Sequence, residues 1–305
     1  YYRDVIYRMK NTMFSDEEIE IRFGPYAKIV NFDKYHHLIE VEEYFLEEMK
    51  QYPTSPCHDL NANEHPYFDN VNYTNFSDFF MMHPLQPELS YIQTEDALIY
   101  GETEFAVDFF SIYAKRLKED NFNKYKTSSR NDTPNEAVVV LIGNNEINKL
   151  CFNKLKYIYN EHGKLAVFKP HPMTNFEDMT YDEFFKNNIH KHINLADRED
   201  DVYDYIKNAE VVYTSHWSET AFHALCLGKR IEPIDTFQSK IFGSFSHINK
   251  HLFETENPEY VINKMFNDYR CGLVNPKYQK DWKERVSKYL SYIHQKRKNY
   301  RFKYI

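Results

Sequence analysis

The sequence predicts an α/β protein whose second half contains a parallel β-sheet. From residue 137 onward, short apolar runs of strand character alternate with segments of helical periodicity. Parallel strands need long crossover connections, which are usually helices, so this alternation indicates βαβ units. The fractions of hydrophobic residues, 42%, and charged residues, 28%, are those of a soluble globular protein. They exclude a disordered, collagen-like or membrane-embedded chain.

The elements of the second half follow one another in a regular order. We expect strands over residues 137–143, 165–169, 193–197, 209–215 and 230–235, and helices over residues 146–161, 201–208 and 218–227. Gly228 directly follows the last of these helices, where glycine commonly ends a helix. The basic segment near the chain end also has helical spacing, with an apolar face formed by Trp282, Val286, Tyr289, Leu290 and Ile293. We expect this final helix to pack against the N-terminal half.

The first half of the chain gives a weaker pattern. Strands are expected at residues 4–9, 19–23 and 27–32, and helices at 38–51 and 103–119. Residues 52–89 are rich in Pro, Asn and Asp, which favours a long functional loop. The polar segment 121–136 has the composition of a linker. We therefore predict two domains, over residues 1–133 and 134–305.

The charge of the chain is unevenly distributed. The net charge is −8, which disfavours a surface built to follow nucleic acid. Residues 270–305, however, hold eleven basic and two acidic residues. This basic end would meet the acidic remainder of the chain, or else make peripheral contact with an anionic membrane or polymer. The four cysteines show no metal-ligand spacing, which favours reduced thiols in the cytoplasm.

Three candidate binding segments directly follow predicted strands, where ligands bind in open parallel sheets. The first is Gly143-Asn144-Asn145. A glycine at this position lets the backbone approach a ligand, and the following helix N-terminus favours phosphate. A tight turn with an asparagine cap explains the same residues equally well.

The second segment is KPHP, residues 169–172. Proline cannot continue a central strand, so the strand ends where Lys169 and His171 stand. Pro172 and the preceding proline hold His171 extended. A stiff imidazole beside a lysine suits a phosphate or a nucleotide, whereas a simple strand-ending turn is the alternative.

The third segment connects the strand over 209–215 to the helix over 218–227. It carries hydroxyl groups and one carboxylate, on Thr214, Ser215, Ser218, Glu219 and Thr220. Hydroxyls and helix N–H groups together can surround a phosphate. Capping of the helix accounts for one of these hydroxyls and not for all of them.

These segments resemble the C-terminal domain of GT-B fold glycosyltransferases that have a His-Pro motif followed by a Ser-rich motif. Such families include bacterial sialyltransferases, capsular Kdo transferases and CDP-glycerol glycerophosphotransferases. The resemblance covers KPHP and TSHWSETAFHALCLGKRIEPID, within residues 137–240. It implies two Rossmann-like domains facing a cleft, with an acceptor-side domain first and a donor-binding domain second. It also implies that His171, Ser215, Ser218 and Thr220 contact a nucleotide-sugar donor, possibly CMP- or CDP-linked.

An inverting transferase also needs a group that takes the proton of the acceptor hydroxyl. Titratable side chains gather in the loop-like segment 58–69, where Asp59, Glu64, His65 and Asp69 are candidates. No carboxylate cluster of metal-ligand spacing lies beside the strand ends, so we expect neither a metal nor another cofactor.

The sequence thus predicts a metal-independent glycosyltransferase of polysaccharide biosynthesis, acting in the cytoplasm or at a membrane surface, with a glycan or other hydroxyl acceptor. Three alternatives remain open. A UDP-sugar epimerase-like enzyme would convert the donor without an acceptor. A nucleic acid could be the acceptor, since aromatic side chains stack on bases. A binding or scaffold protein would bind no nucleotide.

Overall fold

The structure is a computed structural model that describes residues 36–53, 56–58, 71–75, 78–84, 86–119, 135–141, 151–172, 181–237 and 245–301. Contacts within the chain divide it into two compact units. Of the described residues, the first unit contains those between 36 and 112 and between 245 and 301, and the second contains those between 113 and 237. This division differs from the predicted boundary at residue 133, because the chain's last part packs with its first.

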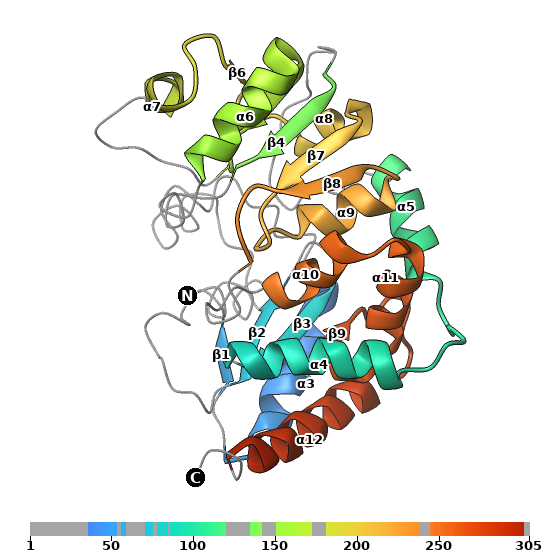
Figure 1. Cartoon of the computed structure of the whole chain (residues 1–305). Coiled ribbons are helices and arrows are strands. Elements are labelled where there is room, and N and C mark those ends of the chain that lie inside the picture. Colours follow the sequence, from blue (N-terminus) through green and yellow to red (C-terminus); the bar gives the residue numbers. More distant parts are fainter. Residues whose placement is uncertain are drawn as a thin grey trace, which may run out of the picture. The chain divides into compact units, whose positions relative to one another are not determined.

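The second unit contains a parallel sheet. Its five strands are β4 (Ala137–Val140), β5 (Ala166–Lys169), β6 (Asn194–Leu195), β7 (Val211–Thr214) and β8 (Arg230–Pro233). They lie in the order β6-β5-β4-β7-β8, and every neighbouring pair is parallel. Figure 1 shows β4, β7 and β8 side by side. All residues of β4, β5 and β7 are buried, as expected for strands covered on both faces. The predicted α/β class with a parallel sheet is confirmed.

Helices connect the strands of this sheet; the sequence predicts those after β4, β6 and β7, but not the one between β5 and β6. They are α6 (Phe152–His162), α7 (Tyr181–Asn188), α8 (Val202–Asn208) and α9 (Thr220–Cys226), and the short helix η5 (Gly163–Leu165) leads into β5. Leu155 of α6 and Phe185 of α7 join the hydrophobic core formed with Val139 and Phe168 of the sheet. The helix α5 (Phe109–Glu119) precedes the sheet in the sequence.

The first unit contains a mixed sheet. Its strands β1 (Pro56–His58), β2 (Val71–Asn75), β3 (Phe80–Pro84) and β9 (Leu273–Val274) lie in that order. Only the β1–β2 pair among them is parallel, so the described strands do not form the parallel sheet of a second Rossmann-like domain. The long loop predicted over residues 52–89 is corrected here: it contains three of these strands, because β3 is buried throughout and pairs with the distant β9.

Helices surround this mixed sheet. They are α3 (His36–Met49), α4 (Pro87–Tyr100), α10 (Ser246–Glu254), α11 (Pro258–Asn267), η6 (Tyr269–Cys271) and α12 (Trp282–Arg301). The predicted helix over 38–51 corresponds to α3, and the one over 103–119 begins later, as α5. The sequence did not predict α4, whose apolar residues do not gather on one face.

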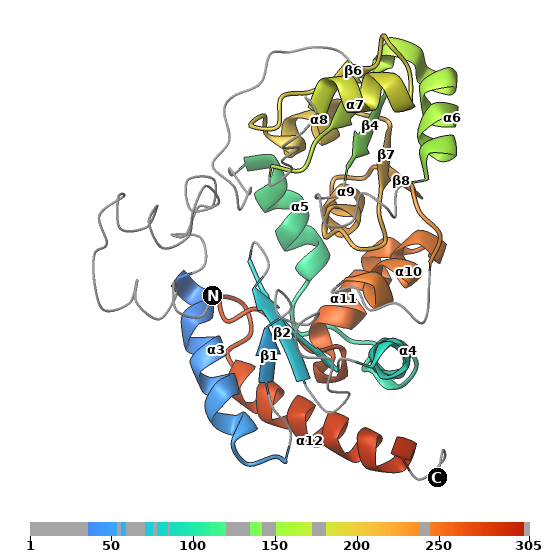
Figure 2. The same cartoon turned by 90° about the vertical axis from the view of Figure 1, so that its left-hand side faces the viewer.

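The final helix α12 packs against residues of the N-terminal half, as predicted. It contacts α3, α4 and η6 (Figures 1 and 2) and buries Val286, Leu290 and Ile293. Near its end, the Tyr292 hydroxyl donates to Asp96 at 2.6 Å, and Lys296 Nζ lies 2.5 Å from the same carboxylate. At least part of the basic end is therefore neutralised by the acidic remainder of the chain. None of the helices in the described part of the chain has the length and apolarity needed to cross a bilayer.

Candidate functional site

The strand order of the parallel sheet places a topological switch point between β4 and β7. The chain runs from β4 outward to β5 and β6, and then returns to form β7 and β8 on the other side of β4. In open α/β sheets, ligands bind outside the carboxyl ends of the strands at such a point. The candidate site is therefore the edge formed by the residues that directly follow these strands.

A hydrogen-bonded group of three side chains lies at the ends of β7 and β8. The parallel register of Thr214 with Pro233 continues one step further, where Ile234 N donates to Thr214 O at 3.0 Å. The residues beyond the strands consequently meet. Ser215 Oγ donates to Asp235 Oδ2 at 2.5 Å, and His216 Nδ1 lies 2.7 Å from Asp235 Oδ1.

The Asp235 carboxylate is ionised at neutral pH. Burial by itself would raise its pKa, but hydrogen bonds from the side chains of His216 and Ser215 and from the His216 N–H outweigh burial, and its pKa is lowered. An ionised carboxylate only accepts hydrogen bonds, so the proton between the two side chains belongs to His216 Nδ1. In the neutral imidazole, Nε2 then holds the lone pair. The pair is sheltered from water, since His216 is 6% exposed.

The hydroxyl loop after β7 is held by its own hydrogen bonds. Ser215 Oγ also accepts from Trp217 N at 3.1 Å. Ser218 Oγ accepts from Thr220 N at 3.2 Å and donates to Thr220 Oγ1 at 2.9 Å. Ser218 thus satisfies a backbone donor where α9 begins, which is the capping role considered for it. Thr214 Oγ1 is buried and has no hydrogen-bond partner among the described residues.

Glu219 stands at the start of α9, directly after Ser218. It is 8% exposed and makes no capping hydrogen bond with its side chain. The predicted residues Thr214, Ser215, Ser218, Glu219 and Thr220 therefore lie together in one buried or half-buried loop. Contact of these residues with a donor stays a prediction.

Lys169 has a structural role at the end of β5. Its side chain is buried, and Nζ donates to Pro170 O and Arg198 O, both at 2.9 Å. These bonds tie the end of β5 to the segment after β6. Burial lowers the pKa of Lys169 to about 8, although Asp200, Asp197 and Asp201 oppose the shift. His171 and Pro172 follow at the same edge, and His171 is half-buried. The contact of Lys169, His171 and Pro172 with a donor remains a prediction.

Several predicted site residues lie outside the described part of the chain. They are Gly143, Asn144, Asn145, Asp59, Glu64, His65 and Asp69. Within the residues that the structure does describe, no group of three or more His, Cys, Asp or Glu side chains could hold a metal ion.

Two residues of the site were not among the predicted ones. His216 lies within the hydroxyl loop, and Asp235 ends the predicted strand over 230–235. Both directly follow neighbouring parallel strands, and this position is the signal that could have identified them. The sequence does not show that β7 and β8 are neighbours. Their pairing brings the imidazole of His216 and the carboxylate of Asp235 within hydrogen-bond distance.

Comparisons with known proteins give little further information. The chain matches no protein-family model, and no curated protein matches its sequence. A solved structure, KpsC from Thermosulfurimonas dismutans, described as a beta Kdo 2,7 transferase, matches 74% of this chain and 80% of its own. The TM-score is 0.39 and the identity is 16%. Values this low establish neither a family nor an activity, so the functional argument rests on the geometry of the site.

Proposed function

We propose that the chain is a metal-independent glycosyltransferase, which moves a sugar from a nucleotide-activated donor to a hydroxyl of a glycan or other polymer. The observation that supports this proposal most is the Ser215–Asp235–His216 group. It lies at the carboxyl ends of adjacent parallel strands, in a sheet whose strand order creates a switch point. β7 borders this switch point, and open α/β sheets bind nucleotides outside the carboxyl ends of the strands there.

The group can act on the departing nucleotide. Cleavage of the sugar–phosphate bond leaves negative charge on phosphate oxygens, and donors aimed at that charge lower the barrier. His216, which Asp235 holds through Nδ1, would donate a hydrogen bond from a protonated Nε2 to the phosphate. Ser218, Thr220 and His171 would bind the rest of the donor, and Lys169 would hold the β5 end in place.

The acceptor hydroxyl must lose a proton during transfer. Asp59, Glu64, His65 and Asp69 remain our candidates for the group that takes this proton if the reaction inverts the anomeric centre. The enzyme would act in polysaccharide biosynthesis, in the cytoplasm or at a membrane surface, where the basic residues not paired within the chain would contact an anionic membrane or polymer.

Nucleotide binding tests this proposal directly. We would measure the shift in Tm caused by CMP, CDP, UDP, GDP and ADP, since a ligand of the folded state stabilises it according to its affinity. At least one nucleotide should raise the Tm of the wild type. Asp235→Asn keeps the size of the side chain but removes its charge, and it should reduce that shift.

The matched control is Asp204→Asn, which changes a surface carboxylate on α8 of the same unit. This variant should respond to nucleotides as the wild type does. If no nucleotide stabilises the wild type, the chain is a binding or scaffold protein. If the donor is isomerised or hydrolysed equally fast with and without acceptors, the epimerase-like alternative replaces the transferase.

A further inference from the structure

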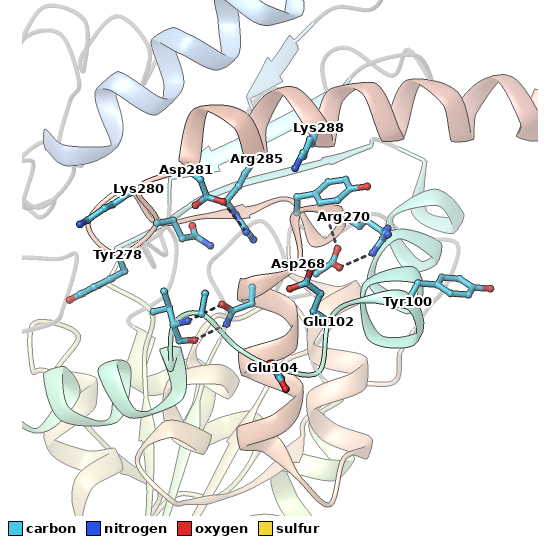
Figure 3. A pocket seen from close by; sticks show the side chains of 15 residues that line it. Tyr100, Glu102, Glu104, Asp268, Arg270, Tyr278, Lys280, Asp281, Arg285 and Lys288 are labelled. Carbon is cyan, nitrogen blue, oxygen red and sulfur yellow. Dashed lines mark hydrogen bonds and ion pairs between the residues drawn. The ribbon is translucent and has the colours of Figure 1, made fainter.

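The first unit contains a pocket that is lined by none of the residues assigned to the proposed transfer. Its volume is about 560 Å³, within the size range of sites for small molecules. It is lined by residues 100–107, by the end of α11, by η6 and by residues 278–288 (Figure 3). The sequence by itself does not indicate this pocket, because its walls come from segments far apart in the chain.

The charges around this pocket balance one another. Its lining contains four basic and four acidic side chains. Arg270 NH1 lies 2.7 Å from Asp268 Oδ2 (Figure 3), and Lys288 Nζ lies 2.6 Å from Glu284 Oε1. A phosphate or polyanion in the pocket would meet as many carboxylates as cations. The lining therefore favours an uncharged ligand.

Arg285 offers unused hydrogen-bond donors in the wall of the pocket. Its side chain is 11% exposed, and NH2 donates to Phe266 O at 2.8 Å. NH1 lies 3.8 Å from Asp281 Oδ2, beyond hydrogen-bond distance, and Nε has no partner among the described residues. A guanidinium has five N–H donors. Because Nε is buried, it is NH1 of Arg285 that offers a donor to a ligand, beside the acceptor oxygens of Asp281.

The rim of the pocket adds an aromatic ring and a carboxylate. Tyr100 is 68% exposed, and within the described part of the chain neither Tyr100 nor Glu102 makes a hydrogen bond or ion pair. An exposed tyrosine ring can stack on an apolar face and still present its hydroxyl to water. A carboxylate accepts hydrogen bonds from hydroxyl groups.

We propose that this pocket binds a neutral polyhydroxyl ligand, namely a short segment of an uncharged glycan. Sugar hydroxyls both donate and accept, so they fit a wall where the donors of Arg285 adjoin the acceptors of Asp281. The exposed ring of Tyr100 points away from Arg285 in Figure 3, so it would stack on the C–H face of another sugar ring of the same glycan segment. The pocket goes beyond the proposed transfer and does not depend on it, because it needs no nucleotide and no donor sugar.

Titration calorimetry of the full chain tests this inference without any nucleotide present. The probes are maltotetraose, cellotetraose and chitotetraose, with inorganic phosphate and heparin as charged comparisons. At least one neutral oligosaccharide should bind. Tyr100→Ala and Glu102→Gln should each weaken that binding about tenfold, the effect of losing roughly 1.4 kcal/mol of contact. Both residues are exposed, so neither change should affect folding.

Tyr157→Ala is the matched control, since Tyr157 is a 58% exposed tyrosine on α6 of the other unit. Its binding should equal that of the wild type. The inference is overturned if none of the neutral oligosaccharides binds, if the two pocket variants bind as tightly as the control, or if only phosphate or heparin binds. Because nucleotide binding is measured separately, a failure here leaves the proposed transfer untouched.

Discussion

At the scale of single residues, Gly272 occupies a position where its backbone conformation and its surroundings both restrict the residue type. Gly272 ends η6 with a φ of 74°, in the left-handed region, and its carbonyl accepts from Met82 N at 2.9 Å. A Cβ atom at this position would lie 2.0 Å from Met82 O. Gly272 is therefore required both by its own backbone conformation and by the close approach of β3.

Gly272→Ala should lower the free energy of unfolding by at least about 3 kcal/mol, since it combines an unfavourable φ with a backbone clash. Gly228→Ala separates the two effects. Gly228 has a φ of 72°, but nothing lies within 4 Å of its added Cβ, so we expect a loss of about 1 kcal/mol. Urea denaturation of both variants measures the difference. Equal losses would contradict the role given to the Met82 contact.

Ser218 is the second residue whose surroundings define a test. Its Oγ accepts from Thr220 N, and an aspartate or asparagine side chain can accept the same hydrogen bond. Both substitutions should leave the fold intact. If donor phosphate binds here, Ser218→Asp should weaken nucleotide binding about tenfold or more through charge repulsion, whereas Ser218→Asn should not. Equal affinities of the two variants would restrict Ser218 to a capping role.

At the scale of whole elements, α12 packs the last part of the chain against the early helices of the first unit. Its apolar face packs against α3 and α4, and Tyr289 OH donates to Gln93 Oε1 at 3.0 Å inside this contact. The basic residues at the end of α12 therefore contribute to ion pairing and packing within the first unit, which their charge alone does not suggest. Lys296 pairs with Asp96, and Arg297 is buried.

Truncation of the apolar face of α12 should destabilise the protein. Ile293 is 1% exposed, so Ile293→Ala should cost about 2–5 kcal/mol of unfolding free energy. Lys298 is exposed on the same helix, and Lys298→Ala should change stability by less than about 0.5 kcal/mol. Thermal or chemical denaturation compares the two. A small loss for Ile293→Ala would mean that α12 does not belong to the core of this unit.

For the molecule as a whole, stability should depend on pH through buried histidines. His247 of α10 is 3% exposed, and its ring centroid lies 5.7 Å from that of His83. Burial, together with His83 and His251, lowers the pKa of His247 well below 6.5. The neighbouring His251 also has a lowered pKa, chiefly because of burial. His247 and His251 are therefore neutral in the folded protein near pH 7.

As the pH falls below 6.5, the unfolded chain binds protons at these histidines that the folded chain does not. Stability must then decrease from pH 6.5 downward, by linkage. Asp235, whose pKa is lowered, adds a further loss at more acidic pH, since its stabilising effect disappears once it is protonated. Well above pH 6.5, where these histidines are neutral in the unfolded chain as well, neither group contributes a slope.

The Tm of the wild type should thus fall between pH 7 and pH 5. His247→Gln cannot take up the proton and should show a shallower decrease, although its Tm at pH 7 will be lower. His192→Gln, at an exposed histidine of the second unit, is the control and should retain the wild-type slope. A wild-type Tm that is constant from pH 7 to pH 5 would contradict the assignment of a neutral, buried His247.

Elements with a strong local signal could be predicted from the sequence. The runs at residues 137–140, 166–169 and 211–214 are apolar on both faces and are bounded by turn residues or by proline, so strands and a parallel sheet followed. The segments after these strands could be identified as a candidate site for the same reason. The signal is local in each case, because strand periodicity and strand ends depend on a few neighbouring residues.

Only the tertiary structure decided how distant segments combine. The pairing of β3 with β9 turned a predicted loop into buried sheet, and the return of α12 to α3 and α4 changed the division of the chain. The Asp235–His216 contact forms because β7 and β8 are neighbours. The pocket around Arg285 forms because three segments that are separate in the sequence come together. Such contacts are set by the burial of complementary surfaces far apart in sequence, and residue spacing alone does not determine them.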